Sequence, residues 1–450
     1  MMTSIFSASR RAPIVAAALA LLVASQMLQA EPHEFVITTA ADAGTGSLRH
    51  ALQQAADEPD QAIRISFGNR EGLFASPRSI ELNTPLPPIA GDVTIDGFIS
   101  NHLWTAYGAT ISGAEKVRIF EILPGATLRL AGITLRHGRA EAGGAILNKG
   151  RLMLDGVSLL ENRSTATGGA IANFGQADLI NSTLAWNRSE LGGALANVDG
   201  SLRLINITAY ENHAAEGAAV WNSAELHLAN SILAGDPSSQ QCLNEGRLSP
   251  ESTHNLIEGH QQGCGKPILS SDPGLESLGY YNGPTPVMPL GGDSPVINMG
   301  LAKAALDAEG NTLRWDQRGN GDPRFAAGFT DLGAFERQGQ LPEAFLVDTL
   351  LDNGLRACTV TGTQNCPLRA AVELAAAARD PTSVRFDARI FDQPQTLILD
   401  EIPAGTDDLS LDFDGDGAAA VTIIIPAKVA WRARNGIRFE IDHDPHGRNQ

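Results

Sequence analysis

A four-residue pattern returns about every 25 residues through the middle of this 450-residue chain. Gly-Gly-Ala-Ile, or a close variant, stands at residues 143–146, 168–171, 192–195 and 217–220. A period of this length is typical of one coil of a solenoid, in which each repeat contacts only its neighbours. The composition agrees, because 46 glycines and 5% aromatic residues suit tight corners and a core of small aliphatic side chains.

Short alternating runs lie between these marks, for example Leu152 with Leu154 and Leu202 with Leu204. Period-two alternation predicts strands, and strands this short, separated by Gly and Asn, leave no room for crossover helices. The chain is therefore expected to coil, with each strand paired to its equivalent about 4.8 Å away in the next coil. Parallel crossovers are almost always right-handed. The sequence thus predicts an all-β, right-handed parallel β-helix with short helical caps.

Three series of asparagines follow the same period. They are Asn148, Asn173, Asn197 and Asn222; Asn162, Asn187 and Asn212; and Asn181, Asn206 and Asn230. Asn tolerates left-handed backbone at turns, and stacked amides can bond to one another as a ladder. The second series also matches the glycosylation pattern Asn-x-Ser at Asn162 and Asn187, but the repeat itself accounts for these residues.

The repeats resemble those of polymorphic outer-membrane proteins and other pectin-lyase-like β-helices, through their Gly-Gly-Ala-Ile units and following Asn. The segment after them resembles the choice-of-anchor Q domain of bacterial surface proteins. The matching motifs are His254-Asn255-Leu256-Ile257, Asn282-Gly283-Pro284-Thr285-Pro286, Ser294-Pro295-Val296-Ile297, Asp316-Gln317-Arg318-Gly319 and Asp331-Leu332-Gly333-Ala334-Phe335-Glu336. The resemblance covers roughly residues 31–338 and implies a bacterial surface protein.

The beginning of the chain is partly repeated near its end. Phe, Asp and Gly stand at identical offsets in residues 35–44 and 345–354. Residues 366–369 then resemble the CSLREA module, although Pro367 and Ala370 depart from that motif. Each copy continues into a predicted helix, capped by Ser47 or started by Pro367, which we expect to cover an open solenoid end. The second copy predicts the start of another, incomplete β-helix.

The first thirty residues have the order of a secretory signal peptide. Arg10 and Arg11 precede an apolar run from Ile14 to Ala24 that is short for a membrane span. We expect cleavage after Ala30, with an uncleaved N-terminal anchor as the alternative. No later apolar stretch is long enough to cross a membrane, so no transmembrane segment is expected after cleavage.

The cysteines form two local pairs, Cys242 with Cys264 and Cys358 with Cys366. An exported protein meets an oxidising compartment, so two disulfides are predicted. A zinc site is the alternative, but the chain has no Cys-x-x-Cys pair. The net charge of −18 argues against nucleic acid, because binding phosphates requires clustered Lys and Arg.

Acidic residues suggest two kinds of chemistry. Asp412, Asp414 and Asp416 have the oxygen spacing that starts a calcium loop, but Ile423 stands where a bidentate Glu is expected. Calcium is the one cofactor that the sequence suggests. Glu161 and Glu211 occupy equivalent places two coils apart, about 10 Å, at the limit of the range for paired hydrolytic carboxylates. Solvated edge charges are the alternative, and no catalytic residues are assigned.

Three aromatic residues stand out in the aromatic-poor coils: Trp186, Tyr210 and Trp221. Alternation places Trp221 outward, in a column with Leu147, Ala172 and Ala196. Exposed rings can stack on sugars or anchor a partner, and packing at the core or rim is the other interpretation.

The predicted organisation has five segments. They are a signal peptide (1–30), an N-terminal cap module with the first coils (31–116), β-helix repeats (117–235), a loop-rich choice-of-anchor Q-like segment (236–340) and a second cap module with the start of another β-helix (341–450). We expect a monomer that is secreted or displayed at the cell surface, with the periplasm as an alternative. Its predicted role is structural, adhesive or glycan-binding and non-catalytic, with a polysaccharide or cell-surface ligand. The alternative is a lyase or hydrolase that cleaves an acidic polysaccharide.

Overall fold

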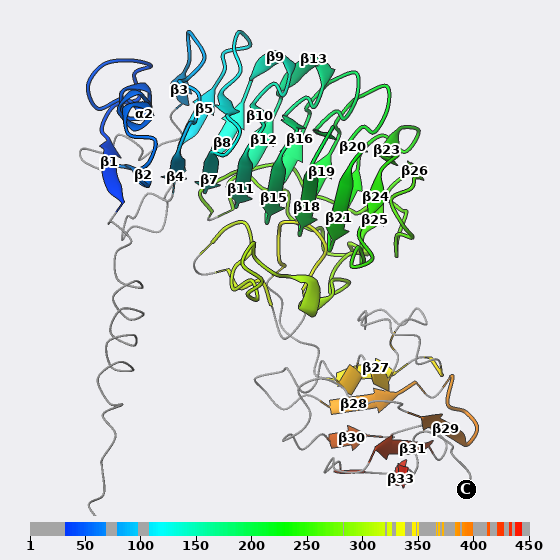
Figure 1. Ribbon diagram of the computed structural model, residues 1–450. Helices are drawn as coiled ribbons and strands as arrows, with labels where there is room; N and C mark the ends of the chain where they lie inside the picture. The colour runs from blue at the N-terminus through cyan, green and yellow to red at the C-terminus, as the bar shows by residue number, and fades with distance from the viewer. Residues whose placement is uncertain are drawn as a thin grey trace, which may run out of the picture.

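The computed structural model describes most of the chain from residue 32 to residue 337 and parts of the remainder. The described residues are 32–68, 79–97, 108–281, 283–319, 322–325, 330–337, 344–347, 349–350, 366, 368–369, 371–372, 383–387, 389–398, 412–414, 421–426, 432–433 and 437–442. The predicted all-β parallel β-helix is confirmed, because three long sheets are stacked from successive coils (Figure 1). Every strand pair within these sheets is parallel.

The three sheets run along the β-helix as its faces. Sheet A contains β1 (His33–Ile37), β2 (Ile63–Phe67), β4 (Asp92–Asp96), β7 (Thr127–Ala131), β11 (Arg151–Asp155), β15 (Gln176–Ile180), β18 (Ser201–Ile205), β21 (Glu225–Ala229) and β24 (Arg247–Leu248). Sheet B contains β3 (Ser79–Glu81), β5 (Thr110–Ser112), β8 (Thr134–Arg136), β12 (Ser158–Leu160), β16 (Thr183–Ala185), β19 (Thr208–Tyr210), β22 (Ile232–Ala234) and β25 (Leu256–Ile257). Sheet C contains β6 (Phe120–Ile122), β10 (Ile146–Asn148), β14 (Ile171–Asn173), β17 (Leu195–Asn197), β20 (Val220–Asn222), β23 (Gln240–Asn244) and β26 (His260–Gln262). A short pair, β9 (Arg139–Ala142) with β13 (Arg163–Thr167), lies between sheets B and C along the chain.

Equivalent side chains form columns, as the repeat predicts. Ile146 pairs with Ile171, Ile171 with Leu195, and Leu195 with Val220. All four are at most 1% exposed, so the column lies in the core. The stack also continues past residue 235, since Val220 pairs onward with Cys242. The repeat pattern does not predict this last coil, because Cys242 stands in place of the aliphatic residue and no Gly-Gly pair precedes it.

Two of the three asparagine series form ladders inside the solenoid. Asn148 donates its amide to Asn173 at 2.6 Å, and the ladder continues through the rest of that series to Asn244. Asn162 and Asn187 each donate to the next residue of their series at 3.0 Å. Because Asn162 and Asn187 are fully buried, their side chains serve the fold and are inaccessible for glycosylation.

The third asparagine series has another role. Asn181, Asn206 and Asn230 have left-handed backbone, with φ of 46°, 53° and 52°. Their amides do not bond to one another. They donate instead to carbonyls of Trp315, Asp331 and Leu301 respectively. The series thus fastens a later part of the chain to the coils.

That later part is the strap, the described residues between 268 and 337, which includes η2 (Ala302–Ala304). Its apolar side chains, such as Val296 and Leu332, pack against Ile232 and Leu256 of sheet B. A second cluster joins it to the end of sheet A through Ile205. The strap therefore covers the outer face of sheet B and the corner with sheet A (Figure 1).

The N-terminal end is capped as expected. The hydroxyl of Ser47 accepts a hydrogen bond from the backbone N–H of His50 at 3.2 Å and starts α2 (Leu48–Asp57). One face of α2 is buried in the main core cluster. The buried residues are Leu48, Ala51, Leu52 and Ala55.

The C-terminal module repeats the register of the first coils. It has one sheet of β27 (Ala344–Val347), β28 (Ser383–Phe386), β30 (Asp412–Asp414) and β32 (Arg432–Ala433), and another of β29 (Gln395–Ile398), β31 (Val421–Pro426) and β33 (Ile437–Asp442). Phe35 pairs with Ile65 in the first module, and Phe345 pairs with Val384 in the second. In the described helical residues of this module, Leu368, Ala371 and Val372 are buried, as are their counterparts in α2.

The predicted signal peptide, residues 1–30, lies outside the described residues. Within the part of the chain that is described, no helix combines the length and apolar character needed to span a membrane.

Candidate functional site

The candidate site is a column of basic residues on the β-helix. Arg139, Arg163, Arg188 and His213 occupy the same position in four successive coils. Arg163 pairs with Arg139 between β13 and β9, and isolated parallel bridges join Arg163 to Arg188 and Arg188 to His213. Neighbouring members are therefore one strand spacing apart, about 4.8 Å. All four are exposed. We call this set the basic column.

The fold positions the basic column through the residues that precede it. Each member follows a buried residue of the second asparagine series or, in the first coil, Gly138. The backbone N–H of Gly138 donates to Asn162 Oδ1 at 2.8 Å, which continues the ladder into that coil. Since the ladder fixes this residue in every coil, the next side chain is directed outward at a constant place.

A groove of about 450 Å³ runs along the basic column. Buried hydroxyl groups contribute to its lining, since Ser164 Oγ lies 2.7 Å from Ser189 Oγ. Its other lining residues are Thr165, Glu190, Ala214 and Ala215. All of these belong to the coils, and no described residue of the strap lines the groove. The strands β9 and β13 lie on the side of the β-helix away from the strap (Figure 1).

The arginines of the basic column have no carboxylate partner among the described residues. Ion pairs occur at many other arginines of the solenoid, but none involves Arg139, Arg163 or Arg188. Glu190 lines the same groove without pairing with them. Three unpaired guanidinium groups in one groove are unexpected in a chain of net charge −18. They favour an anionic ligand.

Acidic residues next to the basic column are engaged elsewhere. Glu161 Oε2 lies 2.8 Å from His137 Nε2, and Glu211 Oε2 accepts a 2.7 Å hydrogen bond from Trp186 Nε1. Each carboxylate thus pairs with the residue one coil earlier in its own column. The basic residues two positions further along the chain, Arg163 and His213, form no ion pair with these two carboxylates.

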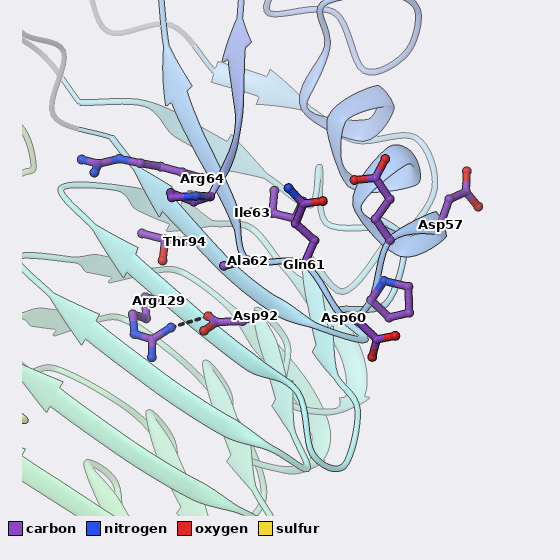
Figure 2. A pocket seen from close by; sticks show the side chains of 12 residues that line it. Asp57, Asp60, Gln61, Ala62, Ile63, Arg64, Asp92, Thr94 and Arg129 are labelled. Carbon is purple, nitrogen blue, oxygen red and sulfur yellow. Dashed lines mark hydrogen bonds and ion pairs between the residues drawn. The ribbon is translucent and has the colours of Figure 1, made fainter. Parts of the chain in front are cut away.

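A larger groove, of about 870 Å³, lies at the N-terminal end and has a different electrostatic character (Figure 2). Arg129 points toward Asp92 and pairs with it, and Arg64 pairs with Asp96 at 3.4 Å. Asp57 and further acidic residues also line it. Because its cations are already neutralised, this groove is the weaker candidate for an anion.

The three predicted aromatic residues are half-buried. Trp186 and Tyr210 pack beside the strap in a cluster with Leu160 and Met288. Trp221 pairs with Ala196 on the outer side of sheet C, in the predicted column. Glu161 and Glu211 stand two coils apart, as expected, but in the separate pairs described above.

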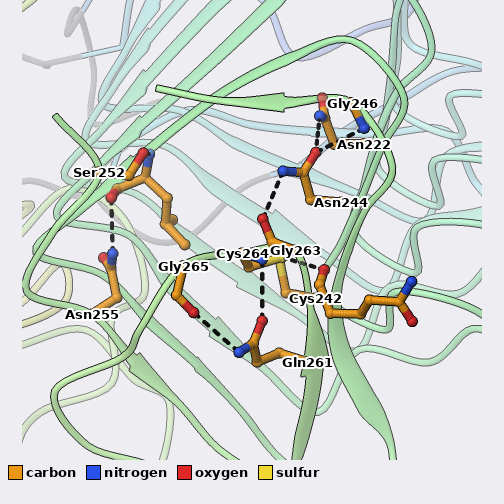
Figure 3. Close-up of a disulfide and its surroundings, with 12 residues drawn as sticks. Asn222, Cys242, Asn244, Gly246, Ser252, Asn255, Gln261, Gly263, Cys264 and Gly265 are labelled. Carbon is orange, nitrogen blue, oxygen red and sulfur yellow. Dashed lines mark hydrogen bonds between the residues drawn. A yellow bond between two sulfur atoms is a disulfide. The ribbon is translucent and has the colours of Figure 1, made fainter. Parts of the chain in front are cut away.

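The disulfide predicted between Cys242 and Cys264 is confirmed (Figure 3). Cys242 is fully buried and Cys264 is 3% exposed, and both belong to the main core cluster. The bond therefore closes the last coil from inside, one coil beyond the last member of the basic column. Cys366 is also disulfide-bonded, while Cys358 lies outside the described residues.

The residues of the predicted calcium loop are only partly described. Asp412 and Asp414 lie in β30, a strand that pairs with β28 in parallel. Asp416 is outside the described residues. Groups of three or more His, Cys, Asp or Glu side chains suited to a metal ion do not occur in the part that the structure describes. The calcium site stays a prediction.

The strap contains several buried charged groups with shifted pKa values. Asp316 and Arg318 form a buried ion pair at 2.6 Å, and Arg324 pairs with Glu336 at 2.8 Å with both side chains fully buried. Burial raises the pKa of Asp331 to about 6. Burial, and next the Asp331 carboxylate, raise the pKa of Glu336 well above its usual value. These residues hold the strap on the coils, because Arg324 donates to Asn181 Oδ1 and the carbonyl of Asp331 accepts from Asn206.

The sequence contained a signal for the basic column. Arg139, Arg163, Arg188 and His213 are separated by 24, 25 and 25 residues, which is the period of the glycine marks. They were not predicted, because the Asn-x-Ser patterns that contain Arg163 and Arg188 are explained by their asparagines alone.

No protein-family model matches this chain, and no curated protein matches it significantly.

Proposed function

We propose that this chain is an exported, non-catalytic β-helix protein that binds an acidic polysaccharide along the basic column. One observation carries the proposal: three arginines from successive coils line one groove with no carboxylate partner among the described residues. Guanidinium groups bind carboxylates through paired, charge-assisted hydrogen bonds. A regular row of them along the solenoid axis suits a linear chain with regularly spaced anionic groups.

The narrow distribution of positive charge in the groove suits a single polymer chain better than a nucleic acid duplex. Binding to duplex phosphates requires many cations spread over a broad surface, whereas the charge here is one narrow column on an acidic protein. The exposed hydroxyl group of Thr165 adds a neutral hydrogen-bonding partner, which suits sugar hydroxyls. An adhesive or anchoring role follows if the polysaccharide belongs to a cell surface.

The proposal is tested by calorimetric titration of polygalacturonate, with neutral dextran as the uncharged comparison. Arg163→Gln and Arg188→Gln are each expected to weaken binding roughly tenfold, since a charged hydrogen bond contributes about 1.5 kcal/mol or more. Arg151→Gln is the matched control, because Arg151 is exposed on sheet A of the same β-helix. Equal losses in all three variants, or equal affinity for dextran, would refute the proposal.

The titrated samples also test the enzymatic alternative. Unsaturated uronate products would indicate a lyase, and new reducing ends without unsaturation would indicate a hydrolase. The proposal expects neither. Export is tested separately, by N-terminal sequencing of the chain recovered outside the cytoplasm, which is expected to begin at Glu31.

A further inference from the structure

The last position of the basic column differs from the other three. Arg139, Arg163 and Arg188 are followed in the next coil by His213, which a parallel bridge joins to Arg188. His213 is exposed and lines the same groove. An arginine keeps its charge at every pH that a folded protein meets, whereas histidine is the side chain whose charge ordinarily changes between pH 5 and 8. The number of cations in the groove therefore depends on pH through this position.

The backbone of His213 is held in the same way as that of Arg188. Its N–H donates to the carbonyl of Asn187 at 2.9 Å, and its carbonyl accepts from the N–H of Ser189 at 3.1 Å; Arg188 makes the equivalent two bonds with the coil before it. The preceding residue, Asn212, is buried and accepts the last amide hydrogen bond of the second asparagine series. These bonds fix position 213 in register, so the imidazole leaves its coil where a guanidinium leaves the previous one.

Charged groups of two coils lie around His213. Arg188 stands one coil before it, and Glu190 lines the groove from that same coil. In its own coil, the carboxylate of Glu211 accepts the indole hydrogen bond described above, and Glu216 is exposed outside the described lining of the groove. The ion pairs of the described histidines involve other residues. The charge of Arg188 therefore opposes a second cation at the next position, and no described carboxylate pairs with that cation.

The next coil provides one further acidic residue, Asp236. Ser238 donates to its carboxylate through both the hydroxyl and the backbone N–H, and the hydroxyl of Ser239 donates as well. These hydrogen bonds lower the pKa of Asp236, and the nearby His213 lowers it to a smaller extent. Asp236 is thus occupied by the serines of its own turn, and the row of cations ends at His213.

An anionic ligand changes the charge balance at this position. A polymer that lies on the three arginines reaches His213 one strand spacing further, about 4.8 Å along the β-helix. The protonated imidazole can donate a charged hydrogen bond to the next anionic group, and the negative charge of the ligand offsets the repulsion from Arg188. Binding of the ligand and protonation of His213 therefore favour each other, and this coupling is reciprocal.

We infer that His213 is a fourth anion-binding position of the groove that operates only when it is protonated, so that the protein holds an acidic polymer more tightly below about pH 6 than at about pH 7.5. This inference rests on the proposed function and adds its regulation. It applies to any polymer whose anionic groups reach all four coils of the basic column.

The test is calorimetric titration of polygalacturonate at about pH 7.5 and about pH 5.5, where its carboxylates stay ionised. The affinity of the unmodified protein should rise roughly threefold to tenfold in acid, because one charged hydrogen bond is gained. His213→Gln should lose most of this rise. His213→Arg should bind at the higher pH about as tightly as the unmodified protein binds at the lower one.

The matched control is His260→Gln, because His260 is exposed on sheet C of the same β-helix and lies outside the described lining of the groove. This variant should keep the full rise. Titration at about pH 6.5 in buffers of different ionisation enthalpy provides a second readout, the number of protons taken up on binding. The unmodified protein and His260→Gln should take up protons, and His213→Gln should take up fewer.

Groups elsewhere that titrate in this range, such as Asp331 of the strap, act equally in all four proteins, so the difference between variants decides. The inference is overturned if the affinity of the unmodified protein does not rise in acid, or if His213→Gln keeps both the rise and the proton uptake. In either case the proposed function stands if Arg163→Gln still weakens binding at the higher pH. If the unmodified protein does not bind the polymer at either pH, the proposed function fails, and this inference fails with it.

Discussion

Removal of the disulfide at the end of the stack should destabilise the chain by a calculable amount. Cys242 and Cys264 are separated by 22 residues. The loop-entropy relation for a closed loop of this size gives about 11 cal/mol/K, or about 3 kcal/mol at 25 °C. The variant is Cys242→Val with Cys264→Ala. Valine suits the first position, because Val220 occupies the same column one coil earlier.

The assay is guanidinium unfolding followed by far-UV circular dichroism. Substitution is preferable to a reductant, which would also reach the disulfide of Cys366. Hydrogen exchange then locates the change. Because a solenoid is stabilised mainly by contacts between neighbouring coils, the amides of β23 and β26 should exchange faster and those of β10 should not.

Two results would contradict this reasoning. A loss below about 1 kcal/mol would mean that the bond does not constrain the unfolded chain as the loop model requires. Faster exchange along the whole stack would mean that the last coil does not fold as a local unit. Polysaccharide affinity should be unaffected, since the groove is formed by earlier coils.

The ladder and the strap provide two further predictions. Asn187→Ala should lower the free energy of unfolding, measured by chemical denaturation, by on the order of 3 kcal/mol. It removes two hydrogen bonds that the Asn187 amide donates and leaves two buried donors of Asn162 without their acceptor. Gln176→Ala, at an exposed position, is the control, and an equal effect of the two substitutions would refute the role of the ladder. Asp331 should titrate near pH 6 by carbon-13 NMR. Since its folded pKa lies above the unfolded value of 3.8, it contributes about 3 kcal/mol of stability that is present below pH 4 and lost as pH rises through 6; titration near pH 4 would contradict this.

The core of the β-helix could be predicted from sequence because its determinants repeat. Ile146, Ile171, Leu195 and Val220 recur with one period, and parallel pairing in register follows directly from that period. The ladder of Asn148 follows for the same reason. In each case a residue's partner is the equivalent residue one period away.

Contacts between residues that are not one repeat apart could not be predicted in this way. Asn181 bonds to Trp315, which stands 134 positions later, and nothing in the local pattern selects that partner over its own series. The strap lacks a repeat, and its position on the coils depends on individual contacts such as the hydrogen bond from Arg324 to Asn181. The basic column has the period of the coils, but three of its four members directly follow asparagines of the second series, which already account for the local pattern.

Basic residues of successive coils stand one strand spacing apart in a single groove, and the candidate site depends on this arrangement. The most direct measurement uses the variant Arg163→Cys with Arg188→Cys and the reagent dibromobimane, which becomes fluorescent when it bridges two adjacent thiols. Strong fluorescence is predicted for this pair, since positions 163 and 188 are paired by a parallel β-bridge between neighbouring coils. The control, Arg163→Cys with Arg151→Cys, places the second thiol on sheet A and should stay dark. A dark first pair, or equal fluorescence from both, would contradict the stacked column and the binding site built on it.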